Sequence, residues 1–570
     1  MRFINFFRSH LLDDLTKAYR RVRIAANGGE RVPHVRTHQI RRGQAAPDLV
    51  VPADAGLGTS VPFHRRAEIP FKCPDVVLGA SKSHRVDDPD QFFRLGIAGA
   101  RRGPERLIGL FKQPVFHQIA RAFQFRKRGA GNQHHGKKCS AHGVLFSCLA
   151  SVVTAGDLPP PITAEDFIEF DRVQAALGQH LFYDPILSGN KNITCAHCHH
   201  PDFGTSDGLS LGIGEGGRGL GPERTAGFGA DRVAKRIPRN ASALWNLGAR
   251  DLHTLFHDGR LSRSDIYGNG FNSPAQEWLP DGLNSLLAAQ ALFPLVAQFE
   301  MAGNPGENEV IGAVHDRIDA AWPILAKRVR AEERYADMFV TAFDHIDTAE
   351  DVTIVEIANA LAAFIAVEWL SIDSPFDHYL AGDADALTTP QKRGIELFYG
   401  KAECASCHSG PLLSDQKFHA LGLPAFGPGR TRPHDPYARD VGRMAESNRL
   451  EDAYAFRTPM LRNVALTGPY GHNGAYPTLE GMIRHHLDPL SARADWNRGA
   501  ARLPPAPWLA QSDFILDADK LEIKRQLAAI QISPLQLTDT EIREIVAFLE
   551  ALTGETVHKP PFGVPPWFEP

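Results

Sequence analysis

The sequence predicts a mainly α-helical protein whose two halves are each built around one copy of a short cysteine–histidine motif. The copies read Cys195-Ala-His-Cys198-His199 and Cys404-Ala-Ser-Cys407-His408. Apolar residues recur at helical spacing around both copies, whereas the residues before them are basic and lack such a pattern. These observations predict two helical domains with long loops, behind a basic irregular N-terminal extension.

Each motif has the spacing of a covalent haem attachment site. Residues at i, i+3 and i+4 share one side of a helical turn, so two thiols and an imidazole can converge there. The thiols would form thioethers to a porphyrin, while His199 or His408 binds its iron. Random placement of 7 cysteines and 25 histidines in 570 residues would give the pattern only about 0.004 times. The alternatives are a dithiol redox pair and a zinc knuckle, and a zinc site would not require a histidine after each pair. We therefore predict two covalently bound haem c groups in two cytochrome c-like domains.

The charge of the chain is divided unevenly. Residues 1–138 contain 26 Lys and Arg against 11 Asp and Glu, whereas the remainder contains 36 against 55. Three interpretations fit the stretch 1–136. It could be a nucleic-acid or membrane-binding arm, a disordered segment, or a region absent from the working protein because the start codon was placed too far upstream. We favour the third interpretation and expect no nucleic-acid partner. The cysteines outside the motifs are Cys73, Cys139 and Cys148, so the main body has no disulfide framework.

Residues 137–156 have the features of a secretory signal peptide. Lys137 and Lys138 precede the short apolar run 143–153, and small residues allow cleavage after Ala155. The alternative is a buried strand or helix. Export agrees with the motifs, because their cysteines must meet haem outside the reducing cytoplasm. No run reaches the roughly 18 apolar residues of a membrane span. We therefore expect a periplasmic protein.

Several elements of the main body can be placed in order. Thr163 is expected to cap a first helix that carries Phe167, Phe170, Val173 and Leu177. The Gly-rich stretch 204–229 predicts a loop along the edge of the first haem. A strong helix with one apolar face is predicted over 350–370.

The second half repeats this organisation. Thr388 or Thr389, with Pro390, is expected to start a helix that runs through residues 394–398. Thr538 and Glu541 form the pattern of a capping box for a final helix over 542–552. The stretch 488–535 carries no motif to which we can assign a function.

Further strings in the same order resemble the bacterial dihaem cytochrome c peroxidases, including their MauG-type branch, over roughly residues 160–555. In the first half these strings are Leu181-Phe-Tyr-Asp184, Arg239-Asn240 and Phe256-His-Asp-Gly-Arg260. In the second half they are Ser374-Pro-Phe-Asp377, Phe418-His-x-Leu-Gly422, Phe456-Arg-Thr-Pro-Met-Leu-Arg-Asn463, Leu466-Thr-Gly-Pro-Tyr-Gly-His-Asn-Gly474 and Thr478-Leu-Glu480. The resemblance implies a peroxidatic haem domain over 157–372 and an electron-transfer haem domain over 373–570.

The resemblance also implies a reaction and its residues. A small cytochrome c or cupredoxin would supply electrons, and hydrogen peroxide would be reduced to water at the first haem. Gln290 and Glu300 match the family's distal glutamine and its acid–base glutamate. A glutamate in an apolar haem pocket would have a raised pKa, which suits proton transfer. The family's removable distal histidine is absent, since no histidine lies between His200 and His253. We expect His200 itself to be a surface residue.

The second haem needs a sixth ligand, and the family's position falls on His486. Relatives carry Met or, in the MauG-type branch, Tyr at this position. His485 and Met482 are the rival ligands on the same segment. Between the haems, His257 stands where the family usually has a tryptophan. That replacement puts a tryptophan-mediated electron path in doubt.

The resemblance further implies a calcium site between the domains, formed by Asn240, Thr467 and Pro469 through oxygen donors. The alternative is ordinary turn hydrogen bonding. Two rival functions stay open: a MauG-type enzyme that oxidises a protein or organic substrate through high-valent haem, and a dihaem electron-transfer protein without catalysis. The sequence is also compatible with a homodimer.

Overall fold

The computed structural model describes residues 158–430 and 439–570. Within these residues the chain is rich in helix and has few, short strands, which confirms the predicted mainly α-helical class. The predicted extension 1–136 and the predicted signal peptide 137–156 lie outside the described residues. In the described part of the chain, no helix combines the length and apolar character needed to cross a membrane.

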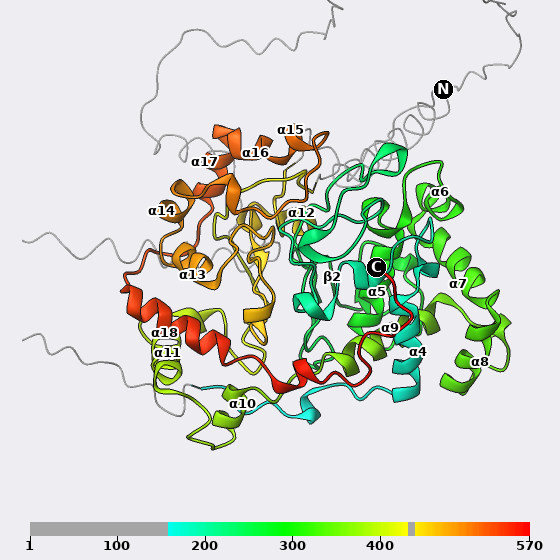
Figure 1. Ribbon diagram of the computed structural model, residues 1–570, viewed down its shortest axis with the longest axis horizontal. Coiled ribbons are helices and arrows are strands. Elements are labelled where there is room, and N and C mark those ends of the chain that lie inside the picture. The colour runs from blue at the N-terminus through cyan, green and yellow to red at the C-terminus, as the bar shows by residue number, and fades with distance from the viewer. Residues whose placement is uncertain (1–157, 431–438) are drawn as a thin grey trace, which may run out of the picture. The chain divides into compact units, whose positions relative to one another are not determined.

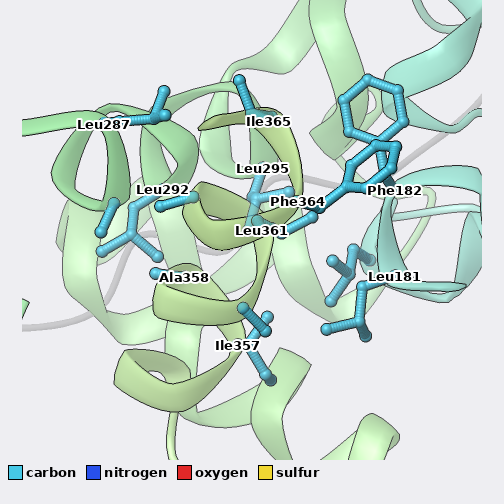
Figure 2. Close-up of a cluster of buried hydrophobic side chains, with 14 of the residues drawn as sticks. Leu181, Phe182, Leu287, Leu292, Leu295, Ile357, Ala358, Leu361, Phe364 and Ile365 are labelled. Carbon is cyan, nitrogen blue, oxygen red and sulfur yellow. The ribbon is translucent and has the colours of Figure 1, made fainter. Parts of the chain in front are cut away.

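The first half is a group of helices around one buried core (Figure 1). Its helices are α4 (Arg172–Tyr183), α5 (Leu286–Val296), α6 (Glu309–Asp316), α7 (Trp322–Arg330), α8 (Glu333–Ala342) and α9 (Ile354–Glu368). Helix α9 contacts both α4 and α5. Figure 2 shows how Leu181 and Phe182 of α4 and Leu292 of α5 surround Leu361 and Phe364 of α9.

Helix α9 forms where the sequence predicts a helix. The Glu356 carboxylate accepts hydrogen bonds from the Thr353 amide and hydroxyl, and the Thr353 hydroxyl accepts one from the Val355 amide. This capping box starts the helix later than predicted, because Ala349–Asp351 forms a separate 3-10 turn. Of its 15 residues, 13 are buried, so α9 is a core helix on all sides rather than one with a single apolar face.

The prediction that Thr163 caps the first helix is wrong. Thr163 caps only the 3-10 turn Ala164–Asp166, and the extended Phe167 then pairs with Ala249. Helix α4 begins at Arg172, where the Asp171 carboxylate accepts hydrogen bonds from the amides of the first turn. A bridge to a residue far along the chain therefore overrides the local helical pattern.

The second half has its own core, formed mainly by α10 (Pro375–Leu380), α11 (Thr389–Tyr399), α13 (Leu479–Leu487) and α18 (Asp539–Glu550). Helices α11 and α18 pack against each other. Both predicted starts are confirmed. Thr388 precedes α11, and Thr538 forms a capping box with Glu541 at the start of α18.

The last residues of the chain return to the first half. Phe562 and Phe568 pack against the first core. The Glu368 carboxylate, at the end of α9, accepts hydrogen bonds of 2.8 Å from the amides of Phe562 and Gly563. Figure 1 shows this segment, in red, running from α18 towards α9 and α4. Residues from both ends of the described chain therefore contribute to the first core.

The remaining elements are short. The stretch 488–535 contains α14 (Pro489–Ala494), α15 (Ala510–Asp513), α16 (Ile515–Ala518) and α17 (Lys520–Ala528), and α12 (Met444–Ser447) lies before it. Strands β1 (Thr254–Leu255), β2 (Leu261–Arg263) and β3 (Phe271–Asn272) form one antiparallel sheet, with Leu255 opposite Leu261. Strand β4 (Phe418–His419) pairs antiparallel with β5 (Phe456–Arg457). Residues 204–229 have no α-helix or strand, which confirms the predicted loop.

Gly178 provides a test of the packing between α4 and α9. A Cβ atom at this position would collide with the Ala360 carbonyl and the Phe364 side chain. We expect Gly178→Ala to destabilise the protein by about 1–3 kcal/mol through overpacking, although alanine favours helices. The matched control is Gly312→Ala in α6, where no atom lies within 4 Å of the new Cβ. Urea unfolding of the holoprotein measures both, and equal stability of the two variants would contradict this packing.

Candidate active site

Both motifs open onto one cavity between the two halves. Its volume is about 910 Å³, near the upper end of the range for ligand and cofactor sites. Its walls include all four motif cysteines together with His199 and His408. The two thiols and the imidazole of each motif thus line the same cavity. The cavity walls also include Gln290, Glu300 and His486, so the structure brings the predicted reactive residues together.

The first motif begins as the 3-10 turn Cys195–His197, which Thr194 caps. The His199 amide then donates to the Cys195 carbonyl, 3.0 Å away, which completes the helical turn. The His199 Nδ1 lies 3.0 Å from the Thr205 carbonyl oxygen. This contact orients the ring as in metal-bound histidines and leaves Nε2 as the nitrogen available to iron. Burial lowers the pKa of His199, so the ring is neutral, as a ligand must be.

The second motif repeats this geometry. After the 3-10 turn Cys404–Ser406, the His408 amide donates to the Cys404 carbonyl at 2.9 Å. The His408 Nδ1 lies 3.1 Å from the Leu413 carbonyl oxygen. Burial is the main cause that lowers the pKa of His408 to about 4. Both proximal histidines are thus held in the same way.

No disulfide joins the four motif cysteines. Burial raises the pKa of Cys195 and of Cys404 to about 12, in each case as the main cause. A catalytic dithiol requires a readily formed thiolate, which these surroundings disfavour. The pKa values therefore argue against the redox-pair interpretation and are compatible with thiols that become thioethers.

The sixth-ligand candidates on α13 are separated by the direction of their side chains. The His486 and His408 rings have centroids 6.4 Å apart, which suits an iron between them at metal–nitrogen bonds of about 2 Å. The His486 Nδ1 is held by the Met482 carbonyl, 2.9 Å away. His485 is buried, and its two nitrogens contact the Tyr476 hydroxyl and the Leu421 carbonyl. Because both nitrogens of His485 are engaged, His486 has the geometry of the ligand. Met482 also reaches the cavity wall.

Glu300 lies in the π-helical turn Gln298–Ala302, which directly follows α5. Gly214 packs against the backbone of Phe299 and Glu300, where a Cβ atom would collide with both. Burial raises the pKa of Glu300, and the Arg260 guanidinium opposes the rise. A raised pKa is the direction expected for a carboxyl group that transfers protons. Gln290 reaches the same cavity from α5.

Glu300 lies on the side of the cavity that carries the first motif, because its backbone packs against Gly214 and Arg224 donates to the carbonyls of both Gly214 and His197. Burial is the main cause that raises the pKa of Cys198, and both Asp207 and Glu300 add to the rise. Arg224 opposes it and donates hydrogen bonds to the His197 carbonyl and, at 3.5 Å, to the Cys198 sulfur. Glu300 is therefore associated with the first motif rather than the second.

The expectation that His200 is a surface residue is wrong. Its side chain is buried between the aromatic rings of Phe203 and Phe568, with centroid distances of 5.9 and 6.2 Å. Phe568 comes from the C-terminal segment that returns to the first half, a contact that local spacing does not reveal. His200 also accepts a hydrogen bond from the Asp202 amide, so it caps a turn rather than facing the cavity.

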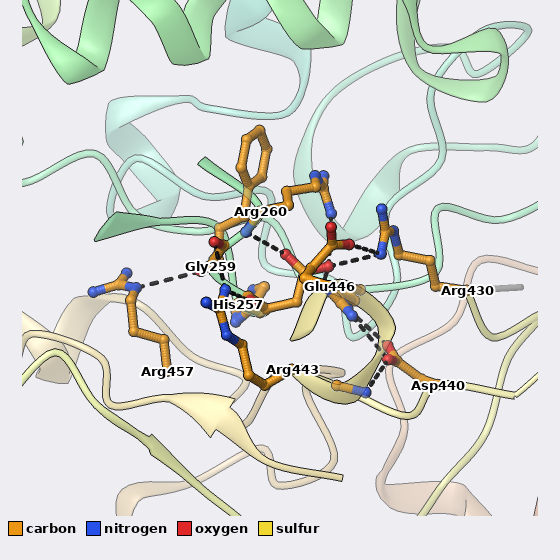
Figure 3. A network of polar contacts seen from close by, with 12 residues as sticks. His257, Gly259, Arg260, Arg430, Asp440, Arg443, Glu446 and Arg457 are labelled. Atoms are coloured by element: carbon orange, nitrogen blue, oxygen red, sulfur yellow. Dashed lines mark hydrogen bonds and ion pairs between the residues drawn. The ribbon is translucent and has the colours of Figure 1, made fainter. Parts of the chain in front are cut away.

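A network of ion pairs joins the two halves beside the cavity (Figure 3). The buried Asp258 carboxylate is bound by Arg239 at 2.7 Å, Arg260 at 3.2 Å and Arg430 at 2.9 Å. Arg239 also pairs with Asp440 of the second half at 2.7 Å. The arginines hold the pKa of Asp258 far below its usual range despite its burial. The carboxylate is therefore charged at any ordinary pH.

His257, in place of the family's tryptophan, lies at this junction. Its Nε2 contacts the Asn240 carbonyl and the Ser242 hydroxyl, each at 3.1 Å, and its own carbonyl accepts from the Arg457 amide at 2.8 Å. Burial and Arg239 lower its pKa to about 4, so the ring is neutral. His257 is therefore neutral, and its backbone carbonyl links the first half to Arg457 of the second half.

The predicted calcium ligands Asn240, Thr467 and Pro469 all reach the cavity wall. The Asn240 side-chain amide donates to the Leu209 carbonyl at 2.8 Å, which leaves its oxygen as the potential donor to a cation. The Thr467 hydroxyl donates to the Val464 carbonyl at 3.1 Å. These contacts agree with ordinary turn bonding as well as with a cation, so calcium stays a prediction.

Three residues in the cavity wall received no functional role from the sequence, although two of them stand in the strings that resemble the family: Asp207, Arg260 and Arg457. Burial is the main cause that raises the pKa of Asp207 to about 6. Burial lowers the pKa of Arg457 to about 10, and no carboxylate among the described residues pairs with it. The half-buried guanidinium donates to the carbonyls of Phe256 and Thr458, at 3.3 and 3.4 Å, and its charge suits an anionic group in the cavity; haem carries two propionates. Together with the thiols and the oriented histidines, Arg457 fits a haem-binding cavity.

Comparison with known proteins gives matches over this same region. The model of the di-haem cytochrome c peroxidase family matches residues 172–385. Methylamine utilization protein MauG of Methylorubrum extorquens is 28% identical over 384 residues, which cover 67% of this chain and 78% of that protein. Cytochrome-c peroxidase IdrP1 of Denitromonas iodatirespirans is 28% identical over 452 residues, covering 74% and 94%. A solved MauG-like protein associated with microbial copper homeostasis is 27% identical with a TM-score of 0.46, covering 71% and 96%.

The assignment of the sixth ligand can be tested by substitution on α13. We expect His486→Ala to remove the low-spin bis-histidine signature of one haem in electron paramagnetic resonance. His485→Phe should keep that signature, because His485 is engaged by Tyr476 and Leu421. Loss of the signature in His485→Phe but not in His486→Ala would reverse the assignment.

Proposed function

We propose that this chain, which belongs to the di-haem cytochrome c peroxidase and MauG family, reduces hydrogen peroxide to water with electrons from a small cytochrome c or cupredoxin. The observation that carries the proposal is the Glu300 carboxyl group, with its raised pKa, in the wall of the cavity that His199 also lines. Electron transfer alone does not require a carboxyl group that exchanges protons, whereas reduction of peroxide requires proton transfer.

The residues that would hold the two haems divide by motif. Cys195, Cys198 and His199 would attach the first, and Cys404, Cys407 and His408 the second. His486 would close the second iron, and Arg457 would pair with a propionate. When bound, the haems supply the iron that binds peroxide and a relay for electrons. The chain itself supplies the positions of these groups and the movement of protons.

Glu300 is suited to that proton movement. Reduction of one peroxide molecule to two waters consumes two electrons and two protons. As a carboxylate, Glu300 would take a proton from one oxygen of the peroxide and return it to the other as the O–O bond breaks. Burial strengthens its affinity for the proton, and Arg260 weakens that affinity enough to allow its release. Gln290 would orient the peroxide through its amide.

Export to the periplasm forms part of the proposal. Attachment of haem through cysteine pairs requires thiols and haem to meet outside the reducing cytoplasm. The pattern of a signal peptide at 137–156 supports the same compartment. A calcium ion bound through Asn240, Thr467 and Pro469 is a further proposal, supported by the common position of these residues in the cavity wall.

One observation favours a second candidate function, the oxidation of a protein or organic substrate as in the MauG-type branch. The loop after the first motif reads Ser210-Leu-Gly-Ile-Gly214 and carries no histidine. The first haem would then be open in the resting protein. His486 opposes simple equivalence, because the MauG-type branch carries tyrosine at that position.

Addition of peroxide to the holoprotein separates these functions. We expect a resting high-spin signal from the first haem, and rapid oxidation of reduced cytochrome c or reduced cupredoxin when peroxide is added. A peroxide-dependent spectral change that persists without donor turnover would support the MauG-type reaction. Two low-spin haems that do not react with peroxide would exclude both enzymatic functions.

The pH dependence tests the role of Glu300. Since burial raises its pKa above the usual value of about 4.3, kcat/KM for peroxide should fall as pH decreases through that raised pKa, where the carboxylate becomes protonated. Glu300→Gln should lower kcat/KM by about 10²–10⁴-fold and remove this limb of the profile. Glu333→Gln in α8, which changes an exposed carboxylate, is the control and should match the wild type. An unchanged limb in Glu300→Gln would assign the proton transfer to another group.

A further inference from the structure

The stretch 488–535 packs onto the loop that follows the first haem motif. Ala506 and Leu509 form a small buried cluster with Leu209, Ile213 and Val233 of that loop. The Trp508 indole donates a hydrogen bond of 2.9 Å to the Val233 carbonyl. The Arg232 guanidinium lies over the Trp508 ring at 4.7 Å. Contacts of several kinds therefore join two segments more than 250 positions apart.

A buried ion pair is at the centre of this contact. The Arg236 guanidinium donates to both carboxylate oxygens of Asp513, at 2.8 and 3.0 Å, and to the Pro504 carbonyl at 2.9 Å. The two side chains are only 2% and 8% exposed. A buried bidentate pair fixes both the distance and the relative orientation of its partners. Removal of one partner would leave the other charge buried and unpaired.

Ser210 is held at the other end of the loop. Its amide donates to the Arg502 carbonyl at 3.0 Å, and its hydroxyl accepts from the Arg502 amide at 2.8 Å. The same hydroxyl donates to the Gly474 carbonyl at 2.6 Å. The loop is thus fixed by the second half of the chain at Ser210 and again at Arg236.

The fixed loop in turn supports the turn that carries Glu300. The Glu215 amide donates to the Phe299 carbonyl at 3.3 Å, and Gly214 packs against the Glu300 backbone. Arg224 donates to the carbonyls of Gly214 and His197, at 3.3 and 3.0 Å. Continuous contacts therefore lead from Asp513, through the loop 209–237, to both Glu300 and the first haem motif.

We infer that Arg236 and Asp513 are positioning residues that fix the loop 209–237, so that Glu300 keeps its place in the cavity wall beside the first haem motif. This inference rests on the proposed function for its catalytic consequence, but not for its structural one. The pair contacts neither peroxide nor haem and acts through the loop.

Asp513→Asn in the holoprotein tests the inference. We expect hydrogen exchange at residues 209–216 to accelerate at least about tenfold, because the loop loses its charged anchor. The value of kcat/KM for peroxide should fall about 10–100-fold, as expected for a misplacement of about 1 Å. The Glu300-dependent limb of the pH profile should shift, which a loss of overall stability would not cause. Asp513→Glu, which keeps the charge, should restore part of each property.

The control is Asp517→Asn, which breaks the more exposed Arg498–Asp517 pair, 2.9 Å apart, within the same stretch. It should leave loop exchange, the pH profile and the resting spin state unchanged. Should Asp513→Asn fail to fold, Trp508→Phe removes the hydrogen bond to Val233 and weakens the contact with Arg232, and it should accelerate exchange at the loop in the same direction.

The outcomes separate this inference from the proposed function. Exchange and resting spin state need no turnover, so accelerated exchange in a protein without peroxidase activity would sustain the anchor and overturn only the reaction. An active enzyme in which Asp513→Asn or Trp508→Phe leaves exchange at 209–216 and the pH profile unchanged would overturn the anchor. Acceleration of exchange throughout the chain, rather than at the loop, would overturn it as well.

Discussion

The alignment of the two halves depends on the ion pairs that the Asp258 carboxylate forms with three arginines. The carboxylate is buried, which by itself would favour its neutral form, yet the three arginines keep it charged. Arg239 and Arg260 come from the first half and Arg430 from the second, so one carboxylate ties together segments that are far apart in sequence. Removing one partner of such a buried group typically costs about 3–5 kcal/mol. The network therefore favours one arrangement of the cavity walls.

The sequence predicts best those features that depend on neighbouring residues. The attachment motifs, the capping box at Thr538 and the core of the long helix near Ile354 are set by contacts within a few positions. The start of α4 could not be predicted, because a distant pairing at Ala249 draws Phe167 out of the helix. The burial of His200 depends on Phe568, near the end of the chain. Long-range contacts thus decide what local patterns leave open.

The same limit applies to the candidate site. Spacing and family resemblance place His199, His408, Glu300 and Gln290, and the structure brings all of them to one cavity. They assign no role to Arg457, which lines the cavity without a carboxylate partner in the described part of the chain. Nor do they separate His485 from His486. The side chains of adjacent helical residues point about 100° apart, and which of the two faces the cavity depends on how the helix is oriented. Packing against Tyr476 and Leu421 gives α13 that orientation.

The proton affinity of Glu300 follows from the junction between the halves rather than from its own turn alone. Burial raises its pKa, and Arg260 is the charge that opposes the rise. Arg260 is shared with Asp258, which lies 3.2 Å from its guanidinium, and is stacked over Phe256 at 3.7 Å. Asp258 thus fixes the position of the guanidinium whose charge opposes the rise in the Glu300 pKa. Through Arg260, the ion-pair network that joins the halves therefore also contributes to the proton affinity of Glu300.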